Sequence, residues 1–268
     1  MLPPPDRPVR APDRITSLDT VPEVESWRLE ALSTWFGPFL PHFVREAIRS
    51  GGAVRIAGAR DAPSGALIEY PAENVASIFA VSPAVAEVLR SLVDRRWVFC
   101  EIPLVPTGER YRIYFSDHLP LESSHRFSHA VRAMPASEMA PVTQLLREAY
   151  ERFDDRWLLA APGDEETGFV VDVAGRPAGV AWASAAGEHA RLHSLFVSPR
   201  YRRLGIGTDL LFARLFWARR AGARTALSEI AEGNLPSQTI AARGGMHPVG
   251  AIFLHAPRRL GGPDAALA

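Results

Sequence analysis

Two glycines and a cluster of arginines separate an apolar stretch from a helical pattern. The segment Arg200–Leu211 reads RYRRLGIGTDLL and follows the apolar stretch LHSLFVSP. Glycines at 205 and 207 leave the backbone amides open to a ligand, and a helix that begins there has no internal acceptor for its first N–H groups. The positive end of the helix dipole lies at the same place. The pattern predicts a cradle for a phosphate or diphosphate, with Arg202 and Arg203 adding positive charge at its rim.

Two common phosphate-binding motifs do not fit this segment. The Rossmann fingerprint needs a third glycine at the position that Leu210 occupies. The P-loop needs a lysine, and every basic residue of this chain other than histidine is arginine. A glycine pair also occurs in ordinary strand-to-helix turns with solvated arginines, so the glycines alone do not decide between a cradle and a turn.

The spacing of the loop residues matches a third motif. Arg202-x-x-Gly205-x-Gly207 resembles the R/Q-x-x-G-x-G/A signature of the GNAT superfamily of acetyl-CoA-dependent N-acetyltransferases. The strand before the loop in that family commonly ends in V-x-P, as Val197–Pro199 does here. The resemblance implies a mixed, mostly antiparallel sheet flanked by helices, which is an α/β (α+β) fold.

The resemblance continues downstream of the loop. After the next strand the family commonly shows an asparagine, a small residue three positions later and a Gly-Phe pair. Asn234, Ser237 and Gly245–Met246 occupy these places, and the match covers residues 125–257 in the family's element order. Agreement in both residue type and spacing makes the resemblance specific.

The resemblance implies which residues would hold acetyl-CoA. The pantetheine arm would lie along a strand splayed from its neighbour and bind backbone groups of Leu195, Phe196 and Val197. The diphosphate would bind the main-chain amides of the loop, which are those of Arg202, Arg203, Leu204, Gly205, Ile206, Gly207 and Thr208. Asn234, assisted by Ser237, would contact the coenzyme near its thiol end. Asparagine is also well suited to cap the following helix, and the two roles of Asn234 are compatible.

Transfer of an acetyl group from a thioester to an amine needs a proton acceptor, a polarised carbonyl and a leaving thiolate. Direct attack requires no enzyme nucleophile, and the lone Cys100 is interpreted as a buried small hydrophobe. The first candidate for the base is Glu229, because related family members place a catalytic glutamate there. The second is His193, whose imidazole titrates in a suitable range. The alternatives for these positions are a polar strand residue and a structural histidine.

The general acid is left open by the sequence. Many family members carry a tyrosine seven residues after the asparagine, where it protonates the leaving thiolate. That position is Ala241 in this chain, so another group or solvent would have to supply the proton.

The elements that must position these residues form two α/β halves. Period-2 apolar patterns predict strands in both halves, among them AVRIAGA, HRFSHAVRAM and TALSEIA, with a hairpin turn at Gly175–Pro177. Patterns with a period of 3.6 residues predict helices over residues 24–52, 83–95, 135–153, 207–223 and 235–245.

We expect a Pro-rich disordered tail over residues 1–20, an N-terminal α/β domain over 21–123, an acetyltransferase domain over 124–258 and a flexible tail over 259–268. IFAVSP at Ile78–Pro83 echoes SLFVSP at Ser194–Pro199, which is consistent with a degenerate GNAT-like first half in a tandem.

Composition limits the remaining possibilities. The 268-residue chain has a formal net charge of zero, which argues against a nucleic-acid coat. One cysteine allows neither an internal disulfide nor a CxxC metal site, so we expect no metal and a reducing, cytoplasmic location. The N-terminus has no apolar signal-peptide region, and no apolar run is long enough to span a membrane.

The sequence therefore predicts an enzyme that moves an acetyl group from acetyl-CoA to a primary amine. The acceptor is expected to be a small-molecule amine or a peptide or protein amine, without nucleic-acid or membrane partners. The alternative is a non-catalytic acyl-CoA-binding sensor or scaffold, which Ala241 favours. The identity of the acceptor, the length of the acyl chain, the role of the first half and the oligomeric state stay open.

Overall fold

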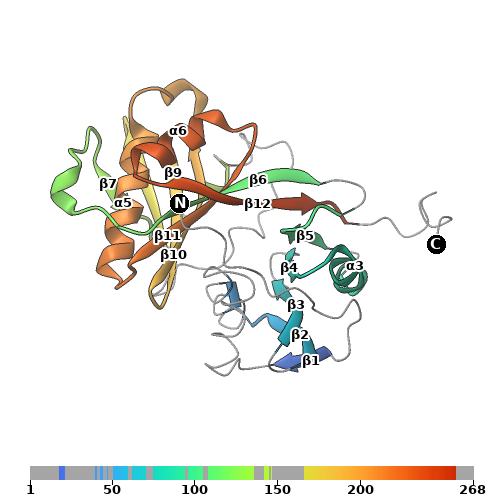
Figure 1. Cartoon of the computed structure of the whole chain (residues 1–268). Helices are drawn as coiled ribbons and strands as arrows, with labels where there is room; N and C mark the ends of the chain where they lie inside the picture. Colours follow the sequence, from blue (N-terminus) through green and yellow to red (C-terminus); the bar gives the residue numbers. More distant parts are fainter. Residues whose placement is uncertain are drawn as a thin grey trace. The chain divides into compact units, whose positions relative to one another are not determined.

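The chain folds into two compact units, which are described separately. The first consists of Met1–Arg110 and Ile252–Ala268, and the second of residues 111–251. The computed structural model describes residues 18–21, 40, 43–44, 47, 51–59, 62–70, 75–93, 96–104, 108–135, 142–144, 146 and 166–257. Both units combine strands and helices, as Figure 1 shows.

The first unit contains a mostly antiparallel sheet, and a helix packs against two of its strands. Its strands pair in the order β1 (Leu18–Val21), β2 (Ala53–Ala59), β3 (Ala62–Tyr70), β4 (Val75–Ala80) and β5 (Trp97–Cys100). Helix α3 (Pro83–Ser91) connects β4 to β5, which are parallel to each other, and packs against β3 and β4. The last residues of β12 (His247–His255) pair antiparallel with β5.

Helix α3 packs closely on the first sheet because Gly65 has no side chain. A Cβ atom at this position would lie 2.8 Å from Leu89 Cδ1 and 2.9 Å from Val85 Cγ1. Ser82 caps the helix, and its hydroxyl accepts a hydrogen bond from Val85 N. The buried guanidinium of Arg90 donates to the backbone carbonyls of Val93, Arg96 and Ala256, so its polar atoms are satisfied.

The second unit is built on a longer sheet. Its strands follow the order β12, β6 (Glu109–Ser116), β11 (Thr225–Ala231), β10 (His189–Val197), β9 (Arg176–Ala186), β8 (Glu166–Val173) and β7 (Val131–Ala133). The pair β10 and β11 is parallel, and the pairs from β7 to β10 and between β11 and β6 are antiparallel. Short 3-10 turns lie at Glu122–Ser124 (η2) and Pro199–Tyr201 (η5).

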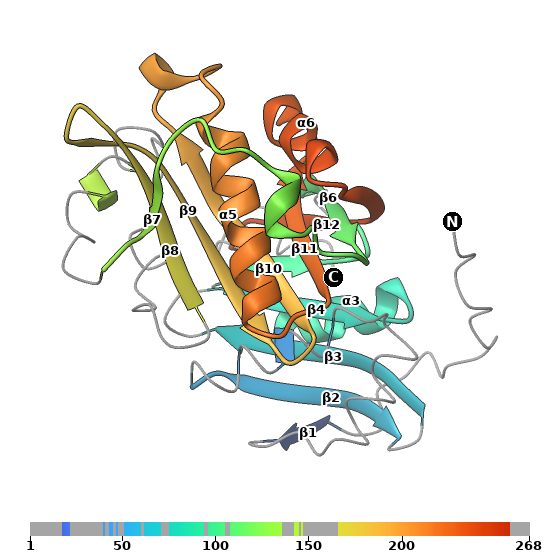
Figure 2. The same ribbon diagram turned by 90° about the vertical axis from the view of Figure 1, so that its left-hand side faces the viewer.

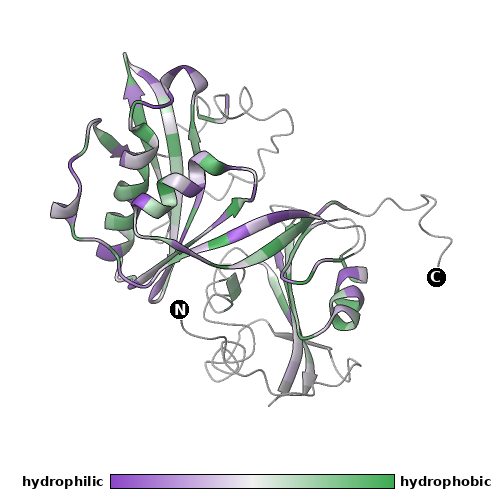
Figure 3. Ribbon diagram, turned by 45° about the horizontal axis from the view of Figure 1, so that its top comes forward, coloured by the Kyte–Doolittle hydropathy of each residue, from purple (hydrophilic) through white to green (hydrophobic). Residues whose placement is uncertain are grey.

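Helix α5 (Ile206–Arg220) covers the strands β8, β9 and β10, as Figure 2 shows. Its residues Leu210, Leu215 and Ala218 are buried in one core with Leu192 of β10. Figure 3 shows hydrophobic residues along this helix and the strands beneath it. The shorter helix α6 (Leu235–Arg243) follows β11 and contacts α5.

The sequence predictions of fold class and of most strands and helices are confirmed. The sheet is mixed and mostly antiparallel with flanking helices, and β2, β11 and the starts of α3 and α6 lie where the patterns placed them. The predicted hairpin near Gly175 is a two-residue turn, in which Ala174 and Gly175 both have positive φ, 52° and 74°. The helices expected over residues 24–52 and 135–153 lie mostly outside the described residues.

Two segments differ from the patterns. The strand predicted for HRFSHAVRAM is confined to Val131–Ala133, because the N–H groups of Ser128 and His129 bond the carboxylate of Asp209 and not a neighbouring strand. Strand β1 includes residues 18–20, which the sequence assigned to the tail. Among the described residues, no helix is both long and apolar enough to cross a membrane.

Each unit contains a strand–helix–strand segment with parallel strands, β4–α3–β5 in the first and β10–α5–β11 in the second. The helix of the first segment begins directly after Val81-Ser82, whereas the second has a loop, residues 198–205, between strand and helix. The echo between IFAVSP and SLFVSP therefore falls at equivalent places in the two segments.

We predict that Cys100 does not react as a free thiol in the folded protein. It is 1% exposed, and burial raises the pKa of its thiol to about 12, so the reactive thiolate is scarce at neutral pH. Titration with Ellman's reagent at pH 7.5 should give a slow reaction for the native protein and one thiol per chain in guanidinium. A native reaction as fast as that of free cysteine would contradict this assignment.

Candidate active site

The parallel strands β10 and β11 are paired only at their beginnings. Their register joins His189 to Thr225, Ala190 to Ala226 and Arg191 to Leu227. Beyond Arg191 the ladder stops, although β10 continues to Val197 and β11 to Ala231. The two strands therefore part, and the printed pairing leaves the stretch of β10 that includes Leu195, Phe196 and Val197 outside the ladder with β11. Backbone N–H and C=O groups of this kind need other partners.

A bulge distorts β10 where it leaves β11. The register with β9 shifts between His193 and Phe196, and Ser194 has a φ of 53°. Arg214 of α5, which is 3% exposed, donates to the carbonyls of Trp182 and His193 at 3.4 and 3.3 Å. Burial lowers the pKa of Arg214 to about 9, which still leaves its guanidinium charged at neutral pH. A buried cation therefore replaces ladder bonds that the bulge removes.

The loop at the end of β10 leads into α5 and leaves its first amides unpaired. Gly205 is the N-cap, with a φ of 91° and no side-chain cap. In the described part of the chain, the N–H groups of residues 203–207 have no acceptor. The N–H of Arg202 donates to Pro199 O, and the N–H of Thr208 donates to Gly205 O. Of the amides of residues 202–208 that the sequence predicted as ligand donors, only those of residues 203–207 are therefore without an acceptor in the described structure.

Arg202 also has a local structural contact. Its Nε donates to Val197 O at 3.2 Å, which ties the loop back to the end of β10. This bond occupies one of the backbone carbonyls that the sequence assigned to ligand binding. Arg203 adopts a positive φ of 64°, which turns the chain toward the helix start.

The two loop glycines have different roles. Gly205 provides the positive φ, and a Cβ there would meet only Ser128 Oγ, at 4.0 Å. A Cβ at Gly207 would lie 2.7 Å from Ile240 Cδ1, so Gly207 permits the close approach of α5 and α6. The glycine pair therefore opens the amides at one position and packs two helices together at the other.

Asn234 and Ser237 lie at the start of α6. The side chain of Asn234 accepts a hydrogen bond from Ser237 N at 3.2 Å, which confirms that Asn234 is the N-cap. Asn234 is exposed and Ser237 is half-buried, and the described residues include no acceptor for the side-chain N–H₂ of Asn234. A ligand that passes the end of β11 can therefore still reach this amide.

Both candidate bases have charged partners. Glu229, whose side chain is 7% exposed, accepts two bonds from Arg191 Nε at 3.2 and 3.3 Å. His193 Nε2 lies 3.2 Å from Glu166 Oε1, within ion-pair distance but without the geometry of a hydrogen bond. Its Nδ1 lies 3.1 Å from Ser194 Oγ. Within the described residues, Nε2 of His193 is thus a buried ring nitrogen that no hydrogen bond satisfies.

Sequence reasoning did not single out Glu166, Arg191 or Arg214. No sequence motif marks a glutamate at the start of a strand or an arginine within a strand or helix. The pairing of β8, β9, β10 and β11 brings Glu166 and Arg191 to the site, and the packing of α5 on β9 and β10 brings Arg214 there.

Ala241, which occupies the position of the family's usual tyrosine, is 2% exposed and lies in the core. Its side chain therefore offers no hydroxyl to protonate a leaving thiolate. A tyrosine hydroxyl reaches α6 from β6 instead, where Tyr114 donates to Gln238 Oε1 at 3.2 Å.

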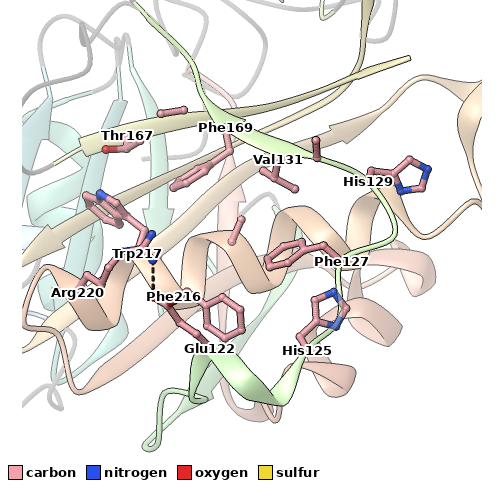
Figure 4. A pocket seen from close by; sticks show the side chains of 13 residues that line it. Glu122, His125, Phe127, His129, Val131, Thr167, Phe169, Phe216, Trp217 and Arg220 are labelled. Carbon is pink, nitrogen blue, oxygen red and sulfur yellow. Dashed lines mark hydrogen bonds and ion pairs between the residues drawn. The ribbon is translucent and has the colours of Figure 1, made fainter. Parts of the chain in front are cut away.

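A pocket of about 490 Å³ lies beside α5, away from the free amides. Figure 4 shows its lining, which includes Phe127, Phe169, Phe216 and Trp217. Arg220 at its edge is paired with Glu122. An aromatic lining with a neutralised cation suits a diphosphate poorly, so the loop at residues 203–207 is the better candidate for an anion site.

Comparison with known proteins identifies relatives of the second unit. Residues 133–245 match the model of the acetyltransferase (GNAT) family. An uncharacterised N-acetyltransferase of Methanocaldococcus jannaschii is 28% identical over 117 residues, which is 36% of this chain and 51% of the relative. The match thus spans about half the length of that relative.

Solved structures share the fold over a larger part of the chain. A Drosophila protein superposes with a TM-score of 0.64 and 14% identity, over 87% of this chain and 96% of that protein. A GNAT-family putative acetyltransferase of Novosphingobium aromaticivorans gives a TM-score of 0.55 at 15% identity, over 73% and 89% of the two chains. At identities this low, the similarity shows that these proteins share the fold of this chain.

We predict that an acidic residue at Gly205 abolishes anion binding at the loop. Millimolar inorganic pyrophosphate should raise the melting temperature of the wild type, because a ligand that binds only the folded state stabilises it. Gly205→Asp should lose this rise, since its carboxylate enters the ring of free amides. The control is Gly222→Asp at the other end of α5, where φ is 90° and space is open.

Both substitutions introduce similar backbone strain of about 1 kcal/mol, but the new carboxylate is favourable at the N-terminus of α5 and unfavourable at its C-terminus. The response of each variant to pyrophosphate is therefore measured against its own melting temperature without ligand, and only Gly205→Asp should lose the rise. An equal pyrophosphate shift in Gly205→Asp and in the wild type would show that the amides are not an anion site.

Proposed function

Because the chain carries a domain of the acetyltransferase (GNAT) family in residues 133–245, we propose that it transfers an acetyl group from acetyl-CoA to a primary amine. One observation supports this above all. The opening between β10 and β11 ends at the loop whose amides at 203–207 are free. A thioester arm and a diphosphate, joined as in CoA, match these two features in their order along β10.

The proposed coenzyme contacts follow from this order. The diphosphate lies on the amides of residues 203–207, at the positive end of the α5 dipole. The pantetheine arm lies along Leu195, Phe196 and Val197, where its amides replace the missing β11 ladder. The thioester then reaches the bulge at Ser194, within range of His193 and of the α6 start at Asn234.

The contacts favour His193 over Glu229 as the group that takes the amine proton. Nε2 of His193 is not hydrogen-bonded in the described part of the structure, whereas both oxygens of Glu229 are bound by Arg191. Glu166 lies where it stabilises a protonated His193 ring. Glu229 remains the second candidate, acting through water once Arg191 is displaced.

The proposed reaction is a direct attack. The amine nitrogen forms a bond to the thioester carbonyl carbon, and the amine proton passes to His193. The C–S bond then breaks, the amide product is left, and the sulfur departs as a thiolate. With Ala241 at the usual tyrosine position, the thiolate takes its proton from solvent, since a free thiol has a pKa of about 8.5.

We propose that the first unit is a degenerate GNAT-like copy that does not bind the coenzyme. Its α3 begins at a Ser82 side-chain cap, so the helix start has no open cradle. Its β4 and β5 stay paired from Val75–Trp97 to Ile78–Cys100, which leaves no unpaired strand edge between them. Its proposed role is to support acceptor binding.

A second candidate function is an acyl-CoA sensor without catalysis. The observation in its favour is Ala241, because the family's usual acid is missing. A sensor would keep the free amides and the strand opening while transferring nothing.

Calorimetry and thiol release test the proposal together. CoA and acetyl-CoA should bind with one site per chain, and Gly222→Asp should bind as the wild type does. Incubation with acetyl-CoA and a panel of small amines and peptides should release free CoA above the hydrolysis background. Binding without release across the panel would favour the sensor, and the absence of binding would exclude both functions.

Substitutions at the two candidate bases should separate their roles. His193→Gln should lower kcat by roughly 10²-fold, the usual loss when a general base is removed, and leave the dissociation constant of CoA unchanged. Glu229→Gln should have a smaller effect on kcat. The assignment is reversed if Glu229→Gln has the larger effect, and it fails if either change mainly weakens CoA binding.

A further inference from the structure

We propose that the segment His125–His129 forms an additional wall of the diphosphate site, with Ser128 as a ligand-binding residue and Asp209 as its positioning residue. This inference rests on the proposed binding of CoA at residues 203–207. It adds a chain segment that precedes residues 133–245, the part matched by the family model, and that forms neither strand nor helix in the structure.

Asp209 fixes this segment to the first turn of α5. The carboxylate is 1% exposed and is joined to His125 Nε2 at 2.9 Å and to His129 Nδ1 at 2.8 Å. It also accepts bonds from the backbone N–H groups of Ser128 at 3.3 Å and His129 at 3.0 Å. The backbone N–H of Asp209 bonds Gly205 O at 3.0 Å, so one residue holds both the helix start and the segment.

Aromatic contacts hold the segment along α5. The ring of His125 stacks flat on Phe212, with 4.1 Å between centroids and 7° between planes. Phe127 packs edge-on against Phe216 with a centroid distance of 5.9 Å. Figure 4 shows the segment passing alongside the helix with these side chains toward it. Packing and hydrogen bonds therefore leave the segment little freedom to move away from α5.

This anchoring places the Ser128 hydroxyl next to the free amides. A Cβ atom built on Gly205 would lie 4.0 Å from Ser128 Oγ, the nearest described atom outside the neighbouring residues of the chain. Ser128 is exposed, and its hydroxyl has no hydrogen-bond partner among the described residues. A phosphate group bridges donors that lie roughly 4–6 Å apart, since each bond to its oxygens is about 2.7–2.9 Å. A phosphate held on the amides at 203–207 can therefore also accept from Ser128.

The four bonds also explain how a buried carboxylate can lie one turn from an anion site. An unpaired carboxylate near residues 203–207 would repel a diphosphate. In Asp209 both oxygens are surrounded by donors, two imidazoles and two backbone amides, whose dipoles point at the charge. The contacts of 2.9 Å to His125 and 2.8 Å to His129 occupy the two carboxylate oxygens, which would otherwise attract a cation.

The first test compares ligands with and without the diphosphate. Ser128→Ala should weaken CoA binding about tenfold, the worth of one bond to a charged oxygen. Its affinity for pantetheine, which has no phosphate, should equal that of the wild type. The matched control is Ser124→Ala, an exposed serine of the preceding turn whose hydroxyl bonds Leu121 O. Calorimetry of the six protein–ligand pairs, three proteins with CoA and with pantetheine, measures these differences.

The second test asks whether Asp209 acts through Ser128. Asp209→Asn should weaken CoA binding to a similar extent, and the double variant Ser128→Ala/Asp209→Asn should lose no more than about tenfold, because positioning and contact form one unit. A merely structural Asp209 would lower the melting temperature and weaken CoA and pantetheine equally.

The outcomes distinguish this inference from the proposed function. If the wild type binds CoA and Ser128→Ala binds it equally well, the segment is not part of the site, whatever Asp209→Asn does. If the wild type binds no CoA, the proposed function itself fails. A tenfold loss that also appears with pantetheine would overturn the assignment of Ser128 to the diphosphate.

Discussion

The candidate site depends on the point at which β10 stops pairing with β11. A parallel ladder that continued past Arg191 toward the end of β11 would leave less of the β10 edge open to a ligand. The bulge at His193–Phe196 maintains the separation, because the twist and kink of a bulge turn the strand from its neighbour. The loop and α5 then begin where the freed edge ends, so strand opening and helix start form one continuous polar surface.

The two units share a topology but differ at the helix start and in strand pairing, and these differences show what an open ligand site needs in addition to that topology. Both have a strand, a helix and a parallel strand in succession. In the first, a serine cap satisfies the helix start and the strands stay paired. In the second, a loop with residues in the left-handed region replaces the cap and the strands part. The same topology thus supports either a closed structural segment or an open one, depending on a few residues after the strand.

Buried charges hold the irregular parts of the second unit in place. Arg214 bonds the carbonyls at the bulge, Asp209 holds the His125–His129 segment, and Arg191 holds Glu229. Burying a charge is costly unless hydrogen bonds and partners compensate it, so such groups are more expensive than apolar ones at the same positions. Arg214 and Asp209 bond backbone groups that a regular strand would have satisfied without a charge. These two buried charges therefore lie where the backbone takes the irregular path that the proposed reaction needs.

Local sequence patterns were enough to predict the main elements and to mark a candidate anion-binding loop. Period and turn residues located β2, β11, α3, α5 and α6, and Gly205, Gly207 and Asn234 marked the loop and the α6 cap, because these depend on local backbone preferences. The tertiary structure alone decided which amides stay free, that Gly207 serves helix packing, and that Glu166, Arg191, Asp209 and Ser128 surround the site. Those facts depend on strand register and on contacts between residues distant in the chain, for which a single sequence carries no local signal.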